Sequence, residues 1–228
     1  MFLRSWLLCA SFLLAAPAWA KGAWQSDGWE QIDQENGIDV YRKTAPGSDV
    51  QGVGGEGLVK APIAKILWVL MDHEHKPQWI DRFQRSYTIE EISPLSDVQY
   101  ASFDMPFPVQ DRDFVYSFET SVSPEGDAVI IAVKSVEHPA MPPAKTVGVR
   151  GEIVRGRYVL YPEGSDATRV IAEYLADPKG SLPSWLVNLV QRSWPLKTLE
   201  SLRRQVQEPY VKEWEPYQQF LKAKLKQG

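Results

Sequence analysis

The sequence predicts an α+β fold in which a curved antiparallel sheet wraps around a long C-terminal helix and encloses a hydrophobic cavity. A central region from Arg85 to Ala176 alternates apolar and polar residues with a period of two and is rich in Val, Ile, Tyr, Phe and Thr. Two regions with helical spacing, Pro62 to Asp72 and Pro183 to Gln207, flank it. The 228 residues are 44% hydrophobic and 24% charged, a balance that allows a buried core.

The first twenty residues are expected to be a secretory leader. Arg4 precedes an apolar stretch, and Ala18-Trp19-Ala20 is typical of a cleavage site. Cleavage would remove Cys9, the single cysteine of the chain. In the alternative interpretation Cys9 is a lipid-modified residue, but the leader before it would then be very short. An exported chain without cysteine is held together by its core, which favours a periplasmic location. We therefore divide the chain into a leader (1–20), one domain (21–208) and an amphipathic helical tail (209–228).

The elements before the central region are expected to be few and short. Residues 21–45 predict a lead-in helix followed by a first strand at Ile38–Tyr41. Val50–Val59 is strand-like but rich in glycine, and Pro62 opens a helix with apolar residues at helical spacing.

The central region predicts a meander of short strands joined by turns such as Ser123-Pro124-Glu125-Gly126. Connections this short cannot carry parallel crossovers, so the strands are antiparallel. The last helix would run about 37 Å at 1.5 Å per residue, long enough to lie across the sheet. A sheet that curls around such a helix leaves an interior space. The expected strands are Ser86–Ile92, Val98–Asp104, Asp113–Val122, Ala128–Val136, Val147–Tyr161 and Thr168–Ala176.

Four stretches, taken in order, resemble the START lipid-transfer domains of the helix-grip superfamily, over roughly residues 24 to 207. They are Lys76-Pro77-Gln78-Trp79; Pro108-Val109-Gln110-Asp111-Arg112-Asp113-Phe114-Val115; Met141-Pro142-Pro143 with Val149-Arg150-Gly151-Glu152; and Pro178 to Asn188. The resemblance implies a hydrophobic tunnel that holds one lipid or other apolar molecule, closed by mouth loops and the C-terminal helix. Steroidogenic members carry an arginine where this chain has Phe118, so sterol specificity is not carried over.

Ten residues are expected to contact the guest molecule: Trp79, Met105, Phe107, Arg112, Tyr116, Phe118, Arg150, Tyr158, Trp185 and Leu189. Two alternatives stay open for several of them. Arg112 is either a donor to a ligand headgroup or part of an ion pair or strand-entry cap, and Arg150 either contacts the ligand or belongs to a structural pair at the sheet rim. Trp79, Met105 and Phe107 either wall the lipid or complete the core. The prolines at 139, 142 and 143 make either a mouth loop or an ordinary rigid connection.

Other motifs predict no cofactor, no metal and no catalytic residue. Gly52-Val53-Gly54-Gly55-Glu56-Gly57 matches G-x-G-x-x-G, but an antiparallel meander follows it, so these glycines are expected to let a strand bend. His73-Glu74-His75 lacks the spacing of a metal site and reads as a solvated turn. Glu119 and Glu173 lie in apolar strands and are candidate perturbed acids.

The sequence thus predicts a periplasmic carrier that binds a lipid or similar apolar molecule and moves it between membranes. The net charge of −4 without a basic run argues against nucleic acid as a partner. We expect a monomer that touches membranes transiently. The tail, with Tyr210, Trp214 and Tyr217 at helical spacing near several lysines, either docks on a membrane or packs on the domain. The alternative is an enzyme of cyclase or hydrolase type on the same scaffold, which would need polar groups converging inside the cavity.

Overall fold

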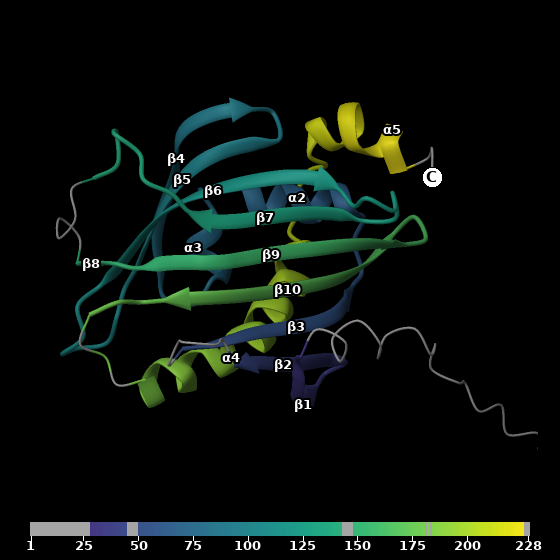
Figure 1. The fold of residues 1–228 in the computed structure, drawn as a ribbon. Helices are drawn as coiled ribbons and strands as arrows, with labels where there is room; N and C mark the ends of the chain where they lie inside the picture. The colour runs from purple at the N-terminus through teal and green to yellow at the C-terminus, as the bar shows by residue number, and fades with distance from the viewer. Residues whose placement is uncertain (1–27, 45–49, 143–147, 181, 183, 226–228) are drawn as a thin grey trace, which may run out of the picture.

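The structure is a computed structural model that describes residues 28–44, 50–142, 148–180, 182 and 184–225. Its main feature is a ten-stranded sheet in the order β1-β2-β3-β10-β9-β7-β6-β5-β4, with β8 paired to β6 (Figure 1). The predicted leader and its cleavage site lie outside the described residues. Among the described pairs, only the short β6–β8 contact is parallel, so the predicted antiparallel meander is confirmed.

The first two strands replace the expected lead-in helix. The segment Glu30–Glu35 is strand β1, which pairs with β2 (Ile38–Thr44) in a hairpin. Asn36 and Gly37 form its turn with φ values of 51° and 67°, a conformation that Asn and Gly adopt at low cost. The helix prediction was therefore wrong over Glu30–Glu35: the Asn-Gly pair is a hairpin signal, and it outweighs the weak helical pattern.

The remaining strands follow the predicted alternation, with bounds that shift by a few residues, except that the single strand predicted over Val147–Tyr161 was wrong: Gly151 divides it into β8 and β9. They are β3 (Gln51–Val59), β4 (Phe83–Ser93), β5 (Ser96–Phe103), β6 (Arg112–Val122), β7 (Val129–Ser135), β8 (Val149–Arg150), β9 (Glu152–Glu163) and β10 (Ala167–Asp177). Because side chains alternate between the two faces, one face of each strand is directed toward the helices and the other toward the outside of the sheet.

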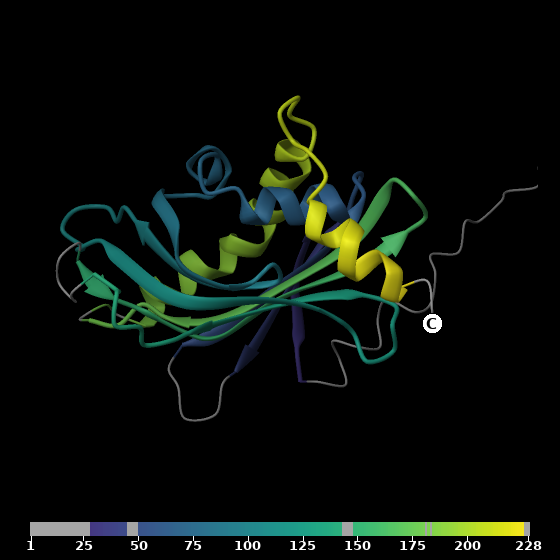
Figure 2. The same ribbon diagram turned by 90° about the horizontal axis from the view of Figure 1, so that it is seen from above.

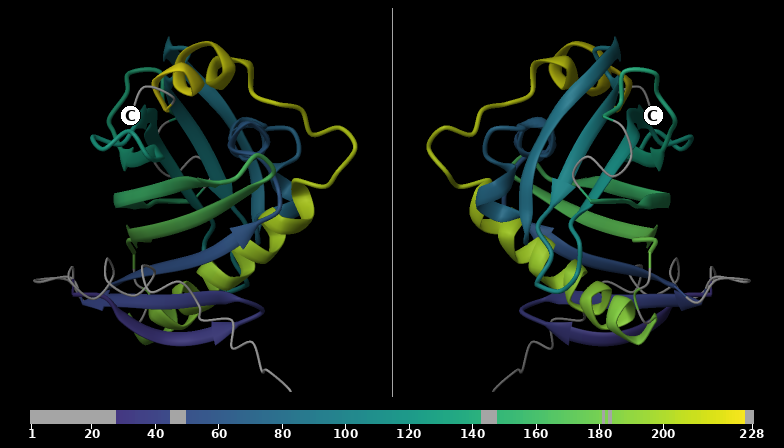
Figure 3. Two further views of the ribbon diagram at one scale, coloured as in Figure 1. Left: turned by 90° about the vertical axis from the view of Figure 1, so that its right-hand side faces the viewer. Right: turned by 90° about the vertical axis from the view of Figure 1, so that its left-hand side faces the viewer.

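The helices lie on one face of the sheet, as Figure 2 shows. They are α2 (Ile63–Met71), α3 (Lys76–Trp79) and α4 (Ser184–Gln205), followed by η1 (Tyr217–Leu221) and α5 (Lys222–Leu225). Seen from the sides, the sheet curls around α4 (Figure 3). Leu199, Leu202 and Val206 are at most 1% exposed, so the apolar stripe predicted for the second half of this helix faces the core.

The glycine-rich strand β3 is where α4 crosses the sheet. A Cβ atom on Gly55 would lie 2.8 Å from Cβ of Pro195 and 3.2 Å from Cδ1 of Leu199, so only a glycine allows this approach. The G-x-G-x-x-G match therefore lies within a paired strand rather than in a turn between a strand and a helix.

The tail after α4 packs on the domain. Trp214 N donates a hydrogen bond of 2.9 Å to Ala64 O of α2. Val211, Tyr217 and Leu221 are buried in the same core as α2 and α4. Within the part of the chain that the structure describes, no helix is long and apolar enough to cross a membrane.

Candidate functional site

A cavity of about 290 Å³ lies between the inner face of the sheet and the helices α3 and α4. Strands β5, β6 and β10 supply its walls through alternate residues, because period-two alternation directs every second side chain inward. On β6, for example, Phe114, Tyr116 and Phe118 all line the cavity. Strand β9 adds Ile153 and Tyr158, which lie on either side of a register shift.

Aromatic rings form most of one wall. Phe83 and Phe103 meet edge to face with centroids 5.1 Å apart, and Phe103 meets Phe114 at 5.7 Å. On the opposite side the Tyr174 ring lies 4.8 Å from the Trp194 ring of α4. Contacts of this kind hold large side chains in place while leaving an apolar surface toward the interior.

One end of the cavity is polar, and its centre is the amine of Lys76. Lys76 Nζ donates to Gln99 Oε1 at 3.3 Å, and the Tyr116 hydroxyl donates to the same oxygen at 3.2 Å. Gln99 Nε2 donates to both carboxylate oxygens of Asp97 at 3.0 Å. His73 lies on the other side, with its Nδ1 3.3 Å from Lys76 Nζ. A buried polar network therefore lies at one end of a mainly apolar cavity.

Burial shifts the pKa values of this network. Desolvation, opposed by the charges of Asp97 and Asp72, lowers the pKa of Lys76 to about 8. Desolvation together with the charge of Lys76 lowers the pKa of His73 to about 4. Burial and the charge of Asp97 raise the pKa of Tyr116, so its hydroxyl stays protonated at neutral pH. Lys76 is only 4% exposed, and among the described residues no carboxylate forms an ion pair with it.

Connecting segments surround the other end of the cavity. The mouth, as we use the word, consists of residues 80–82, 104–111 and 178–180 together with Lys197 of α4. Asp81 and Lys197 line the cavity yet their side chains are 57% and 56% exposed, so the cavity reaches the surface there. Their ion pair of 2.8 Å joins α4 to the segment before β4.

Arg112 ties two of the mouth segments together. Its Nε donates to Pro178 O at 2.9 Å, its Nη2 donates to Lys179 O at 3.1 Å, and its Nη1 donates to Gln110 O. The guanidinium also lines the cavity. Of the two structural alternatives for Arg112, these backbone carbonyl contacts fit the cap at the strand entry rather than an ion pair.

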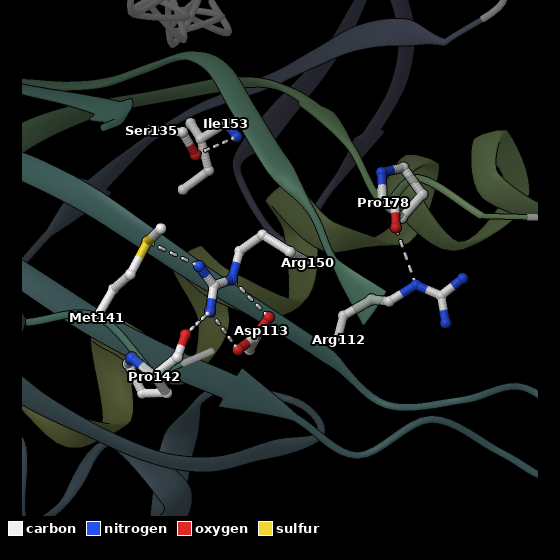
Figure 4. Close-up of polar contacts among 8 residues, drawn as sticks. All are labelled: Arg112, Asp113, Ser135, Met141, Pro142, Arg150, Ile153 and Pro178. Carbon is white, nitrogen blue, oxygen red and sulfur yellow. Dashed lines mark hydrogen bonds and ion pairs between the residues drawn. The ribbon is translucent and has the colours of Figure 1, made fainter. Parts of the chain in front are cut away.

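Arg150 lies on the outer side, away from the cavity lining. Its guanidinium holds both carboxylate oxygens of Asp113, at 2.7 and 2.9 Å, and Nη2 also donates to Pro142 O at 2.9 Å (Figure 4). Bidentate pairing of this kind fixes the long connection before β9 onto β6. The alternative of a structural ion pair is the one that the geometry favours for Arg150.

The cavity brings together six of the ten residues expected to contact a guest: Trp79, Met105, Arg112, Tyr116, Phe118 and Tyr158. Arg150 is not among its lining residues, and neither is Phe107, which is 96% exposed in the mouth segment before β6. The side chains of Trp185 and Leu189 lie outside the described part of the chain, so their contacts stay predictions.

Sequence reasoning missed Lys76, Tyr174 and Trp194 as lining residues. Lys76 stands in one of the motifs that carry the resemblance, but α3 has only four residues, too few to show a periodicity. Tyr174 could have been found by counting inward positions along β10, because Tyr174 and Ala176 share the face that lines the cavity.

The candidate acids do not meet in the cavity. Glu119 is exposed on β6. Glu173 alternates with the lining residue Tyr174, and it pairs with Arg157 and Arg155 on the outer face. His75 pairs with Asp72 at 2.6 Å rather than joining His73. Over the described ranges, no group of three or more metal-ligating side chains occurs.

Comparison with known proteins agrees with this architecture. The profile of the START domain family matches residues 14–210. The chain belongs to the START domain family. A STAR-related lipid transfer protein from Xanthomonas axonopodis, known as a crystal structure, superimposes with a TM-score of 0.69 and 30% identity, covering 80% of this chain and 100% of that one. The helix-grip fold expected from the sequence is therefore confirmed.

Relatives of this START domain occur in bacteria and in animals. An uncharacterized protein of Pseudomonas aeruginosa is 29% identical over 197 residues, covering 86% of this chain and 96% of the relative. The bovine phosphatidylcholine transfer protein is 28% identical over 163 residues, covering 70% of this chain and 75% of the relative. The similarity therefore extends over most of the domain in both.

Proposed function

We propose that this START domain takes up one lipid or similarly apolar molecule in its cavity and carries it between membranes. The observation that carries the proposal is the cavity itself, a space of about 290 Å³ lined mainly by aromatic and aliphatic side chains and open at the mouth. Its relatives, among them a phosphatidylcholine transfer protein, support the same role.

Burial alone supplies enough free energy for capture. Removing on the order of 400 Å² of apolar ligand surface from water yields on the order of 10 kcal/mol before the costs of association. No bond chemistry is needed for such a carrier. The guest would enter when the mouth segments separate, and closure would remove it from water.

The polar network gives the guest an orientation. Lys76 carries three donor hydrogens, and an acceptor group on the guest would complete its hydrogen bonding. We infer that the apolar body of the guest lies against Phe103, Phe114 and Trp194, while a hydroxyl, carbonyl or phosphate oxygen lies near Lys76. This arrangement pairs each part of the guest with a surface of matching polarity.

We also propose that the carrier works in the periplasm. The support is the leader-like segment at residues 1–20 and the absence of cysteine after Cys9. Expression of the full chain with a C-terminal tag, followed by fractionation and mass spectrometry of the N-terminus, tests this. An uncleaved cytoplasmic product would contradict it.

The enzyme alternative has less support. It requires polar groups that converge on a bound substrate, whereas Glu119 and Glu173 lie outside the cavity lining. Of the polar network, Lys76 and Tyr116 line the cavity, and both contact Gln99.

Native mass spectrometry with lipid extraction tests the carrier. Purified protein is mixed with vesicles of bacterial lipids, and the bound species are identified. We expect a one-to-one complex for the wild type and at least about tenfold lower occupancy for Val133→Trp, which fills the cavity. Ala132→Trp is the matched control, because Ala132 is the next residue on β7 and is exposed. A wild type that stays empty, or equal occupancy in Val133→Trp at an unchanged Tm, would contradict the proposal.

A further inference from the structure

The amine of Lys76 is placed as a nucleophile as well as a hydrogen-bond donor. Lys76 is one of the residues that line the cavity and is 4% exposed, and the hydrogen-bond partners of its amine are Gln99 Oε1 and His73 Nδ1. Neither partner is a carboxylate, so among the described residues the amine has no ion pair that would strongly stabilise its charged form. Surface lysines such as Lys134, in contrast, are solvated ammonium ions.

The charged and titratable groups that face the amine come from three elements. Asp72 and His73 precede α3, Asp97 is on β5, and Tyr116 is on β6. Desolvation outweighs the attraction of the two carboxylates and lowers the pKa of Lys76 to about 8. About a tenth of the amine is then neutral at pH 7, and a neutral amine in an apolar site is the reactive form of lysine.

We propose that Lys76 captures apolar aldehydes or ketones by forming an imine with their carbonyl carbon. The lone pair of Nζ attacks the carbonyl carbon, and the C–N bond forms as the C=O π bond breaks. The resulting carbinolamine loses its oxygen as water, which takes both hydrogens of the neutral amine. The product is a C=N bond between guest and protein. The step is reversible and needs no oxidant or reductant.

The Tyr116 hydroxyl is placed to help this reaction. It shares the acceptor Gln99 Oε1 with Lys76, so both groups lie beside the same oxygen at 3.2 and 3.3 Å. Its raised pKa keeps it protonated, so it can donate a proton to the departing oxygen and recover it afterward. Tyr116 thus acts as a proton donor within reach of the reacting atoms.

Reductive trapping tests the proposal, which rests on the proposed function because the carbonyl compound must first enter as an apolar guest. Hexadecanal in phosphatidylcholine vesicles is incubated with the full chain and sodium cyanoborohydride, and the adduct is mapped by peptide mass spectrometry. We expect trapping at Lys76 at pH 7 to be at least about tenfold faster than at Lys134. The trapping rate at Lys76 should rise to about pH 8 and level off, whereas rates at surface lysines continue to rise.

Variants and a competitor separate this site from ordinary surface labelling. Lys76→Met and Lys76→Arg should both remove the fast adduct, and Lys134→Arg should retain it. Tyr116→Phe should slow trapping at Lys76, because it removes the proposed proton donor. Hexadecanol, which has the same chain but no carbonyl, should block the Lys76 adduct. The pH profile is measured on the wild type and so does not depend on how the variants fold.

The outcomes are distinguishable. Adducts spread evenly over exposed lysines, or a rate at Lys76 that keeps rising above pH 9, would overturn the proposal. Hexadecanol binding without any adduct at Lys76 would overturn the imine while leaving the carrier intact. If neither hexadecanol nor hexadecanal enters, the imine and the carrier fail together.

Discussion

The buried amine of Lys76 and the imidazole of His73 lie 3.3 Å apart, so the charge of Lys76 disfavours protonation of His73. His73 also forms hydrogen bonds with Ser86 Oγ at 2.6 Å and with Thr88 Oγ1 at 3.1 Å. These contacts connect the polar end of the cavity to the edge strand β4. The folded state therefore holds His73 in its neutral form.

The lowered pKa of His73 predicts a stability change in mild acid. The native pKa of about 4 lies below the unfolded value of 6.5, so the unfolded chain binds more protons between these two values. Stability should therefore fall as the pH drops from 6.5 to 4, with no further contribution below that. We expect the drop in Tm over this window to be about 5 °C smaller in His73→Gln than in the wild type. Differential scanning calorimetry at fixed ionic strength measures it.

Other titratable groups of the network also change stability in acid, and the comparison of the wild type with His73→Gln controls for them. Burial raises the pKa of Asp97, which acts in the opposite direction and is present in both proteins. Identical pH dependence of Tm in the wild type and His73→Gln would contradict the assignment.

Single residues also show how far sequence reasoning reaches into the site. Tyr116 and Phe118 follow from Arg112 by counting every second residue, and all three line the cavity. Phe107 is as apolar as they are but lies in a connecting segment, where no periodicity sets its direction. Contact of these residues with a guest stays a prediction.

At the scale of elements, the packing of α4 on the sheet depends on the sequence of β3 as well as on the sequence of α4. Its apolar stripe predicts a buried face, and Leu199 and Leu202 are fully buried. The close approach of α4 to the sheet depends on Gly55 of β3. The glycines of this strand had predicted only that the strand bends. The hairpin β1–β2 shows the same limit of sequence reasoning, because the turn residues Asn36 and Gly37 made Glu30–Glu35 a strand rather than the predicted helix.

The tail provides an element-scale prediction. Leu221 is 2% exposed in the core that α2 and α4 share, whereas its neighbour Phe220 is 46% exposed. We expect Leu221→Ala to lower the free energy of unfolding by about 3 kcal/mol, because it leaves a cavity. Phe220→Ala should change it by less than about 0.5 kcal/mol. Urea denaturation of the two variants measures both values.

This pair decides between a packed tail and a free one. If Leu221→Ala and Phe220→Ala have equal, small effects, the tail does not contribute to the core. A membrane-docking tail would instead show a larger effect of Phe220→Ala on vesicle binding than on stability.

At the scale of the whole molecule, one strongly exposed apolar side chain lies at the mouth of the cavity. Phe107, at 96% exposure, projects from the mouth, next to the lining residue Met105. The Asp81–Lys197 ion pair lies at the same end and is exposed, so it contributes little to stability. The mouth therefore carries an exposed apolar side chain, Phe107, and an ion pair that stabilises its closed form only weakly.

Membrane transfer should depend on Phe107. We expect Phe107→Ser to reduce vesicle association about tenfold, since an aromatic side chain moved out of water contributes about 1.5–3 kcal/mol. Stability should be unchanged, because the side chain is exposed. Ile92→Ser is the control, since Ile92 is 59% exposed at the far end of β4 from Phe83, which lines the cavity. Vesicle flotation and fluorescent lipid transfer measure the effect, and equal loss in both variants would contradict a role of the mouth.

The sequence by itself determined the fold class, the antiparallel order of the central strands and the apolar stripe of the last helix, because each of these follows from local periodicity. The tertiary structure decided which polar side chains meet. Lys76, Gln99 and Tyr116 come from three different elements, and their network forms only when α3 packs against the paired strands β5 and β6. The same holds for Arg112 and Arg150: both stand at strand ends, and only long-range contacts place one at the mouth and the other on the outer face.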